Sequence, residues 1–191
     1  MRGLLCSLML VFAVLVSGCT PEAARPLPDS MRVTADERLV GTWRAEILGN
    51  IHTVTITRGS TAGTLVAEMT TRTAAGGSRQ AIASRHVLSF YDFRGTRLIV
   101  EHGPSAVDHR LVYRYAAYDI GADGAVTLRF TSEPEIDRWA SPLRINASIR
   151  GIDPNFRFIY VLADRDTIAA VLASKPASEM FNVAFGPFAR Q

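Results

Sequence analysis

A two-residue alternation of hydrophobic and polar residues runs through most of the chain after Trp43 and constrains its fold more than any other feature. Successive side chains of a β-strand point to opposite faces, so this period predicts strands with one buried and one solvated face. Turn residues such as Gly49-Asn50 separate the runs. The clearest runs cover residues 43–47, 53–57, 65–72, 111–120 and 143–150. We therefore predict a mostly β fold of adjacent antiparallel strands.

Three segments depart from this alternation and predict helical structure. Thr34-Ala-Asp-Glu37 has the form of a capping box and predicts a short helical turn through Leu39. Ser132-Glu-Pro-Glu135 has a similar form and predicts a second short helix. Near the C-terminus, Asp166 as N-cap and apolar residues at helical spacing predict a helix over 166–175. A β-strand through residues 160–167 is the alternative interpretation of that last region.

The N-terminus has the pattern of a cleaved leader. Arg2 precedes an apolar run over residues 4–16, which is too short to span a bilayer. The run ends in Val16-Ser17-Gly18-Cys19, which resembles the lipobox of bacterial lipoprotein signal peptides. This resemblance implies removal of residues 1–18 and acylation of Cys19. An uncleaved N-terminal anchor and an ordinary secretory signal are the alternatives.

Three prolines punctuate the residues that follow Cys19, so we predict a proline-rich tether over residues 19–33 and one folded domain over 34–191. The residue after the cysteine is Thr20. In the lipoproteins that this leader resembles, an aspartate at that place often signals retention in the inner membrane. The resemblance therefore implies the cell envelope, on the periplasmic face of the outer membrane.

The start of the folded domain carries a second resemblance. Gly41-Thr42-Trp43 follows the predicted helical turn and is similar to the Gly-x-Trp opening of lipocalins and other calycins. Small bacterial lipoproteins with a Gly-x-Trp opening are similar too. The lipocalin resemblance implies an antiparallel β-barrel, and we expect about eight to ten strands. The helix predicted over 166–175 would then precede the last strand. The lipocalin resemblance also implies that Trp43 packs at the barrel floor and that a late arginine, here Arg190, lies across it.

Charge and cysteine content exclude several classes of function. The chain has 21 basic and 18 acidic residues, and the basic ones are scattered singly, so we expect no nucleic-acid partner. Its two cysteines are Cys6, in the leader, and Cys19. A processed chain would therefore have no free thiol for a disulfide, a thiolate metal site or a cysteine nucleophile.

Familiar catalytic signatures are missing. The chain has no Gly-x-Ser-x-Gly elbow, phosphate loop, Gly-x-Gly-x-x-Gly fingerprint or His-Glu-x-x-His motif. Glu101-His102 and Asp108-His109 bracket one loop and are residue types that bind zinc. Their spacing matches no known metal pattern, and a solvated hairpin loop is the simpler interpretation. We predict no metal and no cofactor.

The candidate ligand-binding residues are polar or aromatic side chains on predicted strands or near a predicted barrel end. Ser84 and His86 share the phase of the apolar residues around them, so they face either a ligand or a partner in the core. Tyr113 and Tyr115 share one face of another strand. Trp139 lies on the predicted second helix, as a lid or a hydrophobic plug.

We therefore expect a lipid-anchored envelope protein that is not an enzyme and that binds a small apolar ligand or an envelope protein partner. The alternative is an envelope enzyme, a hydrolase or isomerase, with a site inside the barrel. That site would use His86 or the loop that carries His102 and His109.

Overall fold

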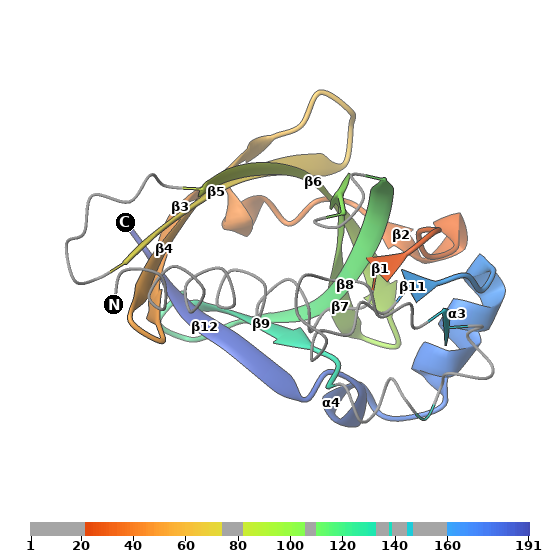
Figure 1. Ribbon diagram of the computed structural model, residues 1–191. Helices are drawn as coiled ribbons and strands as arrows, with labels where there is room; N and C mark the ends of the chain where they lie inside the picture. Colours follow the sequence, from red (N-terminus) through yellow and green to blue (C-terminus); the bar gives the residue numbers. More distant parts are fainter. Residues whose placement is uncertain (1–21, 74–81, 106–109, 133–137, 139–144, 147–159) are drawn as a thin grey trace, which may run out of the picture.

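Eight antiparallel strands close into a β-barrel in the computed structural model, which describes residues 22–73, 82–105, 110–132, 138, 145–146 and 160–191 (Figure 1). The strands follow one another around the barrel in the order β3-β4-β5-β6-β7-β8-β9-β12, and β12 returns to β3. The predicted fold class is confirmed. The barrel strands are β3 (Gly41–Ile47), β4 (Asn50–Arg58), β5 (Thr64–Thr73), β6 (Ile82–Phe93), β7 (Thr96–Pro104), β8 (Leu111–Ile120), β9 (Val126–Phe130) and β12 (Val183–Arg190).

The last strand completes the closure. One end of β12 pairs with β3, where Arg190 lies opposite Trp43, and the other end pairs with β9, where Val183 lies opposite Phe130. The register shifts between Phe185 and Phe188, around Gly186-Pro187. Proline cannot donate a ladder hydrogen bond, so a register break is the place where a closing strand tolerates it.

Because neighbouring strands alternate in direction, each strand end belongs to one of two rims. The first rim holds the start of β3 and the end of β12, and we call it the Trp43 rim. The second holds the β3–β4 turn at Leu48 and the starts of β8 and β12, and we call it the Leu48 rim. The position of a residue along the barrel axis is described below relative to these two rims.

Short elements surround the barrel. On its first half, β8 pairs with β1, which continues the sheet through β11 and β10, and β2 pairs with β6. The predicted helix before the last strand is confirmed, and a short helix follows it. These elements are β1 (Glu22–Ala23), η1 (Asp29–Met31), β2 (Arg32–Val33), η2 (Glu37–Leu39), β10 (Ile145–Asn146), β11 (Tyr160–Val161), α3 (Arg165–Ala173) and α4 (Ala177–Met180).

The prediction of an extended tether over residues 19–33 does not hold for residues 22–33. Glu22 and Ala23 pair with both β8 and β11, and Leu27 is completely buried. The tether was predicted from its prolines. Proline removes a backbone hydrogen-bond donor, but it does not prevent an extended segment from packing on a sheet. The folded domain therefore includes at least residues 22–33.

Both described helical starts use a different N-cap from the predicted one. The turn η2 is capped by Asp36, whose carboxylate accepts a hydrogen bond from the Arg38 amide, and not by Thr34. The helix α3 is capped by Asp164, which accepts from the Thr167 amide at 2.8 Å, and not by Asp166. Both observed N-caps are aspartates, and aspartate is among the residues favoured at the N-cap position of a helix. The predicted helix over Ser132 to Trp139 lies outside the described residues, except for residues 132 and 138.

The barrel interior forms one hydrophobic core. Its members alternate along each strand with residues of the outer face, as the period of two requires. Toward the Trp43 rim this inner core is closed by Leu39 of η2 and by Trp43, whose indole N–H donates to the Leu39 carbonyl at 2.7 Å. Its buried members are Leu39, Trp43, Ala45, Ile56, Leu65, Ala67, Leu88, Phe90, Ile99, Tyr118, Val126 and Phe188.

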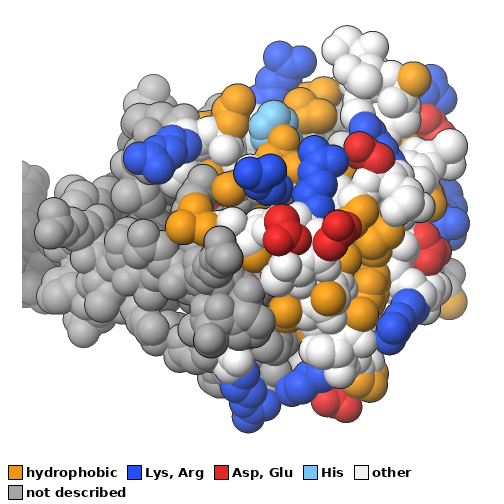
Figure 2. All heavy atoms as spheres, turned by 90° about the vertical axis from the view of Figure 1, so that its right-hand side faces the viewer, with side chains coloured by type: hydrophobic (Ala, Val, Ile, Leu, Met, Phe, Trp, Pro, Cys, Tyr) orange, Lys and Arg blue, Asp and Glu red, His pale blue; other side chains and the backbone are white. Residues whose placement is uncertain are grey.

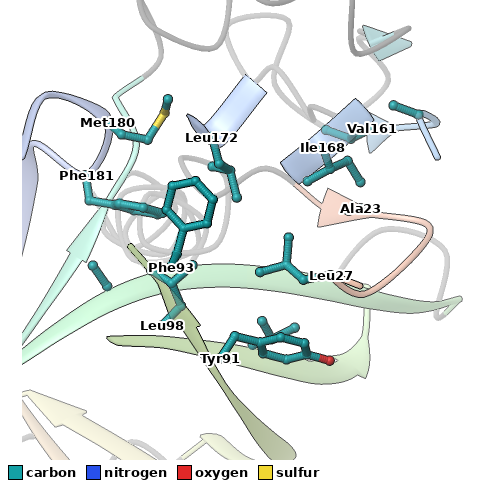
Figure 3. Packing of buried hydrophobic residues seen from close by; sticks show 13 residues of the cluster. Ala23, Leu27, Tyr91, Phe93, Leu98, Val161, Ile168, Leu172, Met180 and Phe181 are labelled. Carbon is teal, nitrogen blue, oxygen red and sulfur yellow. The ribbon is translucent and has the colours of Figure 1, made fainter. Parts of the chain in front are cut away.

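A second hydrophobic core covers the outer face of β6, β7 and β8. Figure 3 shows Leu172 of α3 and Phe181 after α4 directed toward Phe93 and Leu98 of the barrel, with Leu27 beside them. Three neighbouring strands thus bury both faces. This outer core consists of Ala23, Leu27, Tyr91, Phe93, Leu98, Val100, Ala117, Val161, Ala163, Ile168, Leu172, Met180 and Phe181.

Candidate functional site

A charged cluster lies on the inner face of three adjacent strands. Leu88 of β6 lies opposite Glu101 of β7, and Glu101 lies opposite Arg114 of β8. Residues that face each other across a ladder share a sheet face, so Glu101 and Arg114 point the same way as Leu88 of the inner core. His86 lies two residues before Leu88 and shares that face. The cluster lies on the Leu48 side of the inner core.

Glu101 stands at the centre of this cluster. Its Oε1 is 2.8 Å from Nδ1 of His86 and accepts a hydrogen bond from Nη1 of Arg114 at 2.6 Å. The His86 contact has the length of an ion pair, but the ring nitrogen is not aligned for a hydrogen bond. The carboxylate therefore interacts with a histidine on one side and a guanidinium on the other.

A fourth member comes from the N-terminal segment. Nη2 of Arg114 donates to Oε1 of Glu22 at 2.5 Å and to the Pro104 carbonyl at 3.1 Å. The side chains of Arg114 and Glu22 are only 10% and 8% exposed. One buried guanidinium thus joins two carboxylates that are far apart in the sequence, and it holds β1 against the barrel.

The pKa values reflect this pairing. Burial alone would raise the pKa of Glu101, but its close contacts with His86 and Arg114 outweigh burial and lower the pKa. Burial would likewise lower the pKa of Arg114, and the two carboxylates raise it instead.

Gly103 makes room for the histidine. A Cβ atom at this position would lie 2.5 Å from Nδ1 of His86, which is closer than any real contact. Glycine in a strand interior often marks such a close approach. Gly103, Glu22 and Arg114 were not among the site residues predicted from the sequence. The signal available for Arg114 was its place between Tyr113 and Tyr115, which puts it on the opposite face of the strand from the two tyrosines.

A second histidine is buried in the barrel wall. His52 of β4 contacts Oγ1 of Thr71 through Nδ1 at 3.1 Å and packs edge-on against Phe185. Burial lowers the pKa of His52, so its neutral form is favoured. Its partners are a hydroxyl and an aromatic ring, which indicates a hydrogen-bonded core histidine.

The Trp43 rim is held by polar contacts to a buried aspartate. Asp36 accepts hydrogen bonds from Arg38, from Arg97 at 3.1 Å and from the Tyr118 hydroxyl at 3.0 Å. The bond from Arg38 is the largest of the effects that lower the pKa of Asp36 to about 2. Burial in turn raises the pKa of Tyr118 to about 12. This group fixes η2 across the end of the barrel.

The structure brings Trp43 and Arg190 together at the same rim. The Arg190 guanidinium lies 5.3 Å from the centre of the Trp43 ring and donates to the Val40 carbonyl. A guanidinium over an indole gains a cation–π interaction. The contact joins the first and last barrel strands.

The predicted ligand residues fall on two different faces. Ser84 and His86 share the inner face, whereas Tyr113 and Tyr115 pack against the outer core, and the Tyr115 hydroxyl donates to the Arg25 carbonyl. Burial raises the pKa of Tyr115. The two tyrosines therefore do not line the same space as Ser84 and His86. Trp139 and Cys19 lie outside the described residues.

The predicted loop site of His102 and His109 does not share a face with Glu101. His102 is adjacent to Glu101 in a strand and points outward, where it stacks on Tyr113 with ring centres 4.6 Å apart. His109 lies outside the described residues. Among the described residues, no group of three or more His, Cys, Asp or Glu side chains is arranged to hold a metal ion.

One described pocket lies outside the barrel. It has a volume of about 340 Å³ and lies between the β6–β7 turn and the segment that joins α3 to α4. Arg94 crosses it and donates to the Ala173 carbonyl at 3.0 Å. The described part of the chain contains no helix long and apolar enough to cross a membrane.

On the face that carries the N-terminal segment, the described residues present basic, acidic and hydrophobic side chains side by side. Figure 2 shows basic side chains spread over this face, between acidic and hydrophobic ones.

Comparison of the chain with family models, with curated proteins and with solved structures gives no match. The closed antiparallel barrel, with a helical turn before its first strand, is compatible with a calycin-like fold.

Proposed function

We propose that this protein is a lipid-anchored protein of the bacterial cell envelope whose barrel binds a small, largely apolar ligand and does not convert it. The anchor is the acylated Cys19 of the lipobox, and the periplasmic face of the outer membrane is the location that Thr20 favours. An apolar ligand suits a barrel whose interior is apolar toward the Trp43 rim.

The observation that carries this proposal is the charged cluster on the inner face. Replacing a buried ion pair by hydrophobic residues is often neutral or stabilising, so stability alone gives little reason to place Glu101 and Arg114 inside a barrel. Ligand sites combine a mostly apolar lining with a few placed polar groups. The charged cluster lies on the Leu48 side of the apolar inner core, and the two together have that composition.

The test is native mass spectrometry of the chain extracted from its own membrane in detergent. We expect a small-molecule mass beyond that of the acylated polypeptide, and its loss in Glu101→Gln. The matched control is Glu68→Gln, because Glu68 is 64% exposed and pairs with Arg85 at 3.6 Å. Thermal unfolding of each variant reports whether it is folded. A wild-type chain with no added mass, and no binding of the apolar probe N-phenyl-1-naphthylamine, would overturn the proposal.

An enzyme that works inside the barrel is the second candidate. It is favoured by one contact, the 2.8 Å approach of Glu101 to His86, since an imidazole beside a carboxylate can serve general acid–base catalysis. The test is hydrolysis of p-nitrophenyl butyrate by the purified chain. Activity that disappears in His86→Gln and survives in His102→Gln would support this candidate, and equal rates in all three chains would remove it.

A further inference from the structure

The pocket outside the barrel is formed by two segments that are far apart in the sequence. One wall is the β6–β7 turn, with Phe93, Arg94 and Thr96, and the other is the link from α3 to α4 over residues 173–177. The volume of about 340 Å³ lies at the small end of the ~300–1,000 Å³ range of ligand pockets. The pocket therefore has room for a small organic molecule.

Both charged side chains that line this pocket are basic. They are Arg94, from the turn, and Lys175, from the link; the lining, all of it described, contains no aspartate or glutamate. Lys175 is partly buried. The nearby carboxylate of Asp92 accepts a hydrogen bond from the Gly95 amide at 2.9 Å, and Asp92 lies on the opposite strand face from Phe93. The charges of the lining thus favour an anion.

Arg94 retains donors for such an anion. Its Nη1 donates to the Ala173 carbonyl at 3.0 Å, which holds the guanidinium across the pocket. A guanidinium has five N–H donors, and no carboxylate among the described residues pairs with Arg94. Arginine commonly binds a carboxylate through two parallel N–H donors. One hydrogen bond therefore positions Arg94, and its other N–H groups can bind a ligand.

The rest of the lining combines a hydroxyl group with apolar side chains. Thr96 is partly exposed, and its hydroxyl has no partner among the described residues. The Ser174 hydroxyl, in contrast, already donates to the Val171 carbonyl at 2.7 Å. Phe93 and Pro176 supply apolar contacts. A few polar groups in a partly apolar lining are typical of a ligand site, and here they match an anionic group with a short apolar body.

We propose that this pocket binds a small organic carboxylate. The carboxylate group lies against Arg94 and Lys175, the Thr96 hydroxyl donates to it, and the hydrocarbon part packs on Phe93 and Pro176. Phe93 belongs to the outer core, so the site is on the outside of the barrel and apart from the charged cluster of the inner face. The inference is therefore independent of the proposed function.

The experiment uses Lys175 as a reporter, because it is the only lysine of the chain. The full chain in detergent is methylated with formaldehyde and dimethylamine–borane at increasing concentrations of hexanoate, and mass spectrometry of the peptide that contains Lys175 measures the reaction. Hexanol is the matched probe with the same carbon chain and no charge, and inorganic phosphate is an anion with no apolar part. We expect methylation to slow about tenfold when hexanoate reaches roughly ten times its dissociation constant, and neither other probe to protect Lys175.

Variants assign the protection to the pocket. Arg94→Gln should weaken hexanoate binding about tenfold or more, the usual effect of losing a charge-assisted hydrogen bond. Thr96→Val should weaken it less, and this variant keeps the bond from Arg94 to Ala173. The control is Arg58→Gln, because Arg58 is 77% exposed and pairs with Glu37 at the end of β4.

Four outcomes would each overturn the proposal. They are no protection by hexanoate, equal protection by hexanol, equal protection by phosphate, and equal weakening in Arg94→Gln and Arg58→Gln. Circular dichroism of each variant reports whether it is folded. The comparison of the three probes needs only the wild-type chain, so it decides the ligand class even if Arg94→Gln does not fold.

Discussion

Arg114 forms ion pairs with two carboxylates inside the protein, those of Glu22 and Glu101. Removing it in Arg114→Met leaves Glu22 and Glu101 without their shared guanidinium, and an unpaired buried charge typically costs ~3–5 kcal/mol. We expect the free energy of unfolding, measured by urea denaturation in detergent, to fall by about that amount. Adding Glu22→Gln to this variant should recover part of the loss, because it removes one of the unpaired charges.

The matched control for that experiment is Arg129→Met. Arg129 pairs with Asp119 at 2.7 Å, but the two side chains are 45% and 63% exposed. An exposed pair contributes ~0–1 kcal/mol. Equal losses of stability in Arg114→Met and Arg129→Met would contradict the assignment of a buried cluster.

Asp36 makes the free energy of unfolding depend on pH in the acid range. Its pKa is about 2 in the folded protein, below the value of 3.8 expected when it is unpaired. A lowered pKa stabilises the folded state at pH above the unfolded value, and the gain is lost as the pH falls from 3.8 toward 2. We expect Asp36→Asn to lower the free energy of unfolding by about 2 kcal/mol at neutral pH and by much less near pH 2.

Urea denaturation between pH 7 and pH 2 measures this difference. Asp119→Asn is the control, because its carboxylate is exposed and its loss should change stability little at any pH. A gap between wild type and Asp36→Asn that stays constant down to pH 2 would show that the buried carboxylate is not the source of the pH dependence.

At the level of single elements, the N-terminal segment belongs to the folded domain through Leu27. This side chain is completely buried in the outer core. Leu27→Ala should leave a cavity and lower the free energy of unfolding by ~2–4 kcal/mol. Leu162→Ala, at a 47% exposed position, should lower it by ~0.5 kcal/mol or less. If both variants unfold at the same urea concentration, residues 22–33 contribute no more than a tether would.

The elements also show which information the sequence carries. Alternation predicts the strands and their faces, because a residue and its second neighbour point the same way whatever the topology. Ser84 and His86 could therefore be assigned to one face. The error at residues 22–33 has the opposite origin, since a two-residue strand such as β1 is too short for any period and depends on its partners.

The candidate site illustrates the same limit. Glu22 and Arg114 are 92 residues apart, and their ion pair exists because β1 adds to β8 in one particular register. Nothing local to either residue specifies that register. Tyr113 and Tyr115 were grouped with His86 by residue type, but strand phase alone could not say which face of β8 was the inside.

For the whole molecule, the arrangement of two cores on shared strands means that neither can be lost alone. Tyr91, Leu98 and Ala117 of β6, β7 and β8 lie in the outer core. Their neighbours Phe90, Ile99 and Tyr118 lie in the inner one. Because β6, β7 and β8 contribute side chains to both cores, unfolding of one core would remove packing contacts that hold the strands of the other in place. The barrel, the N-terminal segment and the helices should therefore unfold as one cooperative unit.

Two probes in one urea titration test this cooperativity. The fluorescence of Trp43, in a Trp139→Phe background, reports the inner core, and hydrogen exchange at the α3 amides near Leu172 reports the outer core. We expect coincident midpoints, and Leu172→Ala should shift both by the same amount although it touches only the outer core. Exchange at α3 that begins well below the Trp43 transition would show instead that the helices form a separable layer on an independently stable barrel.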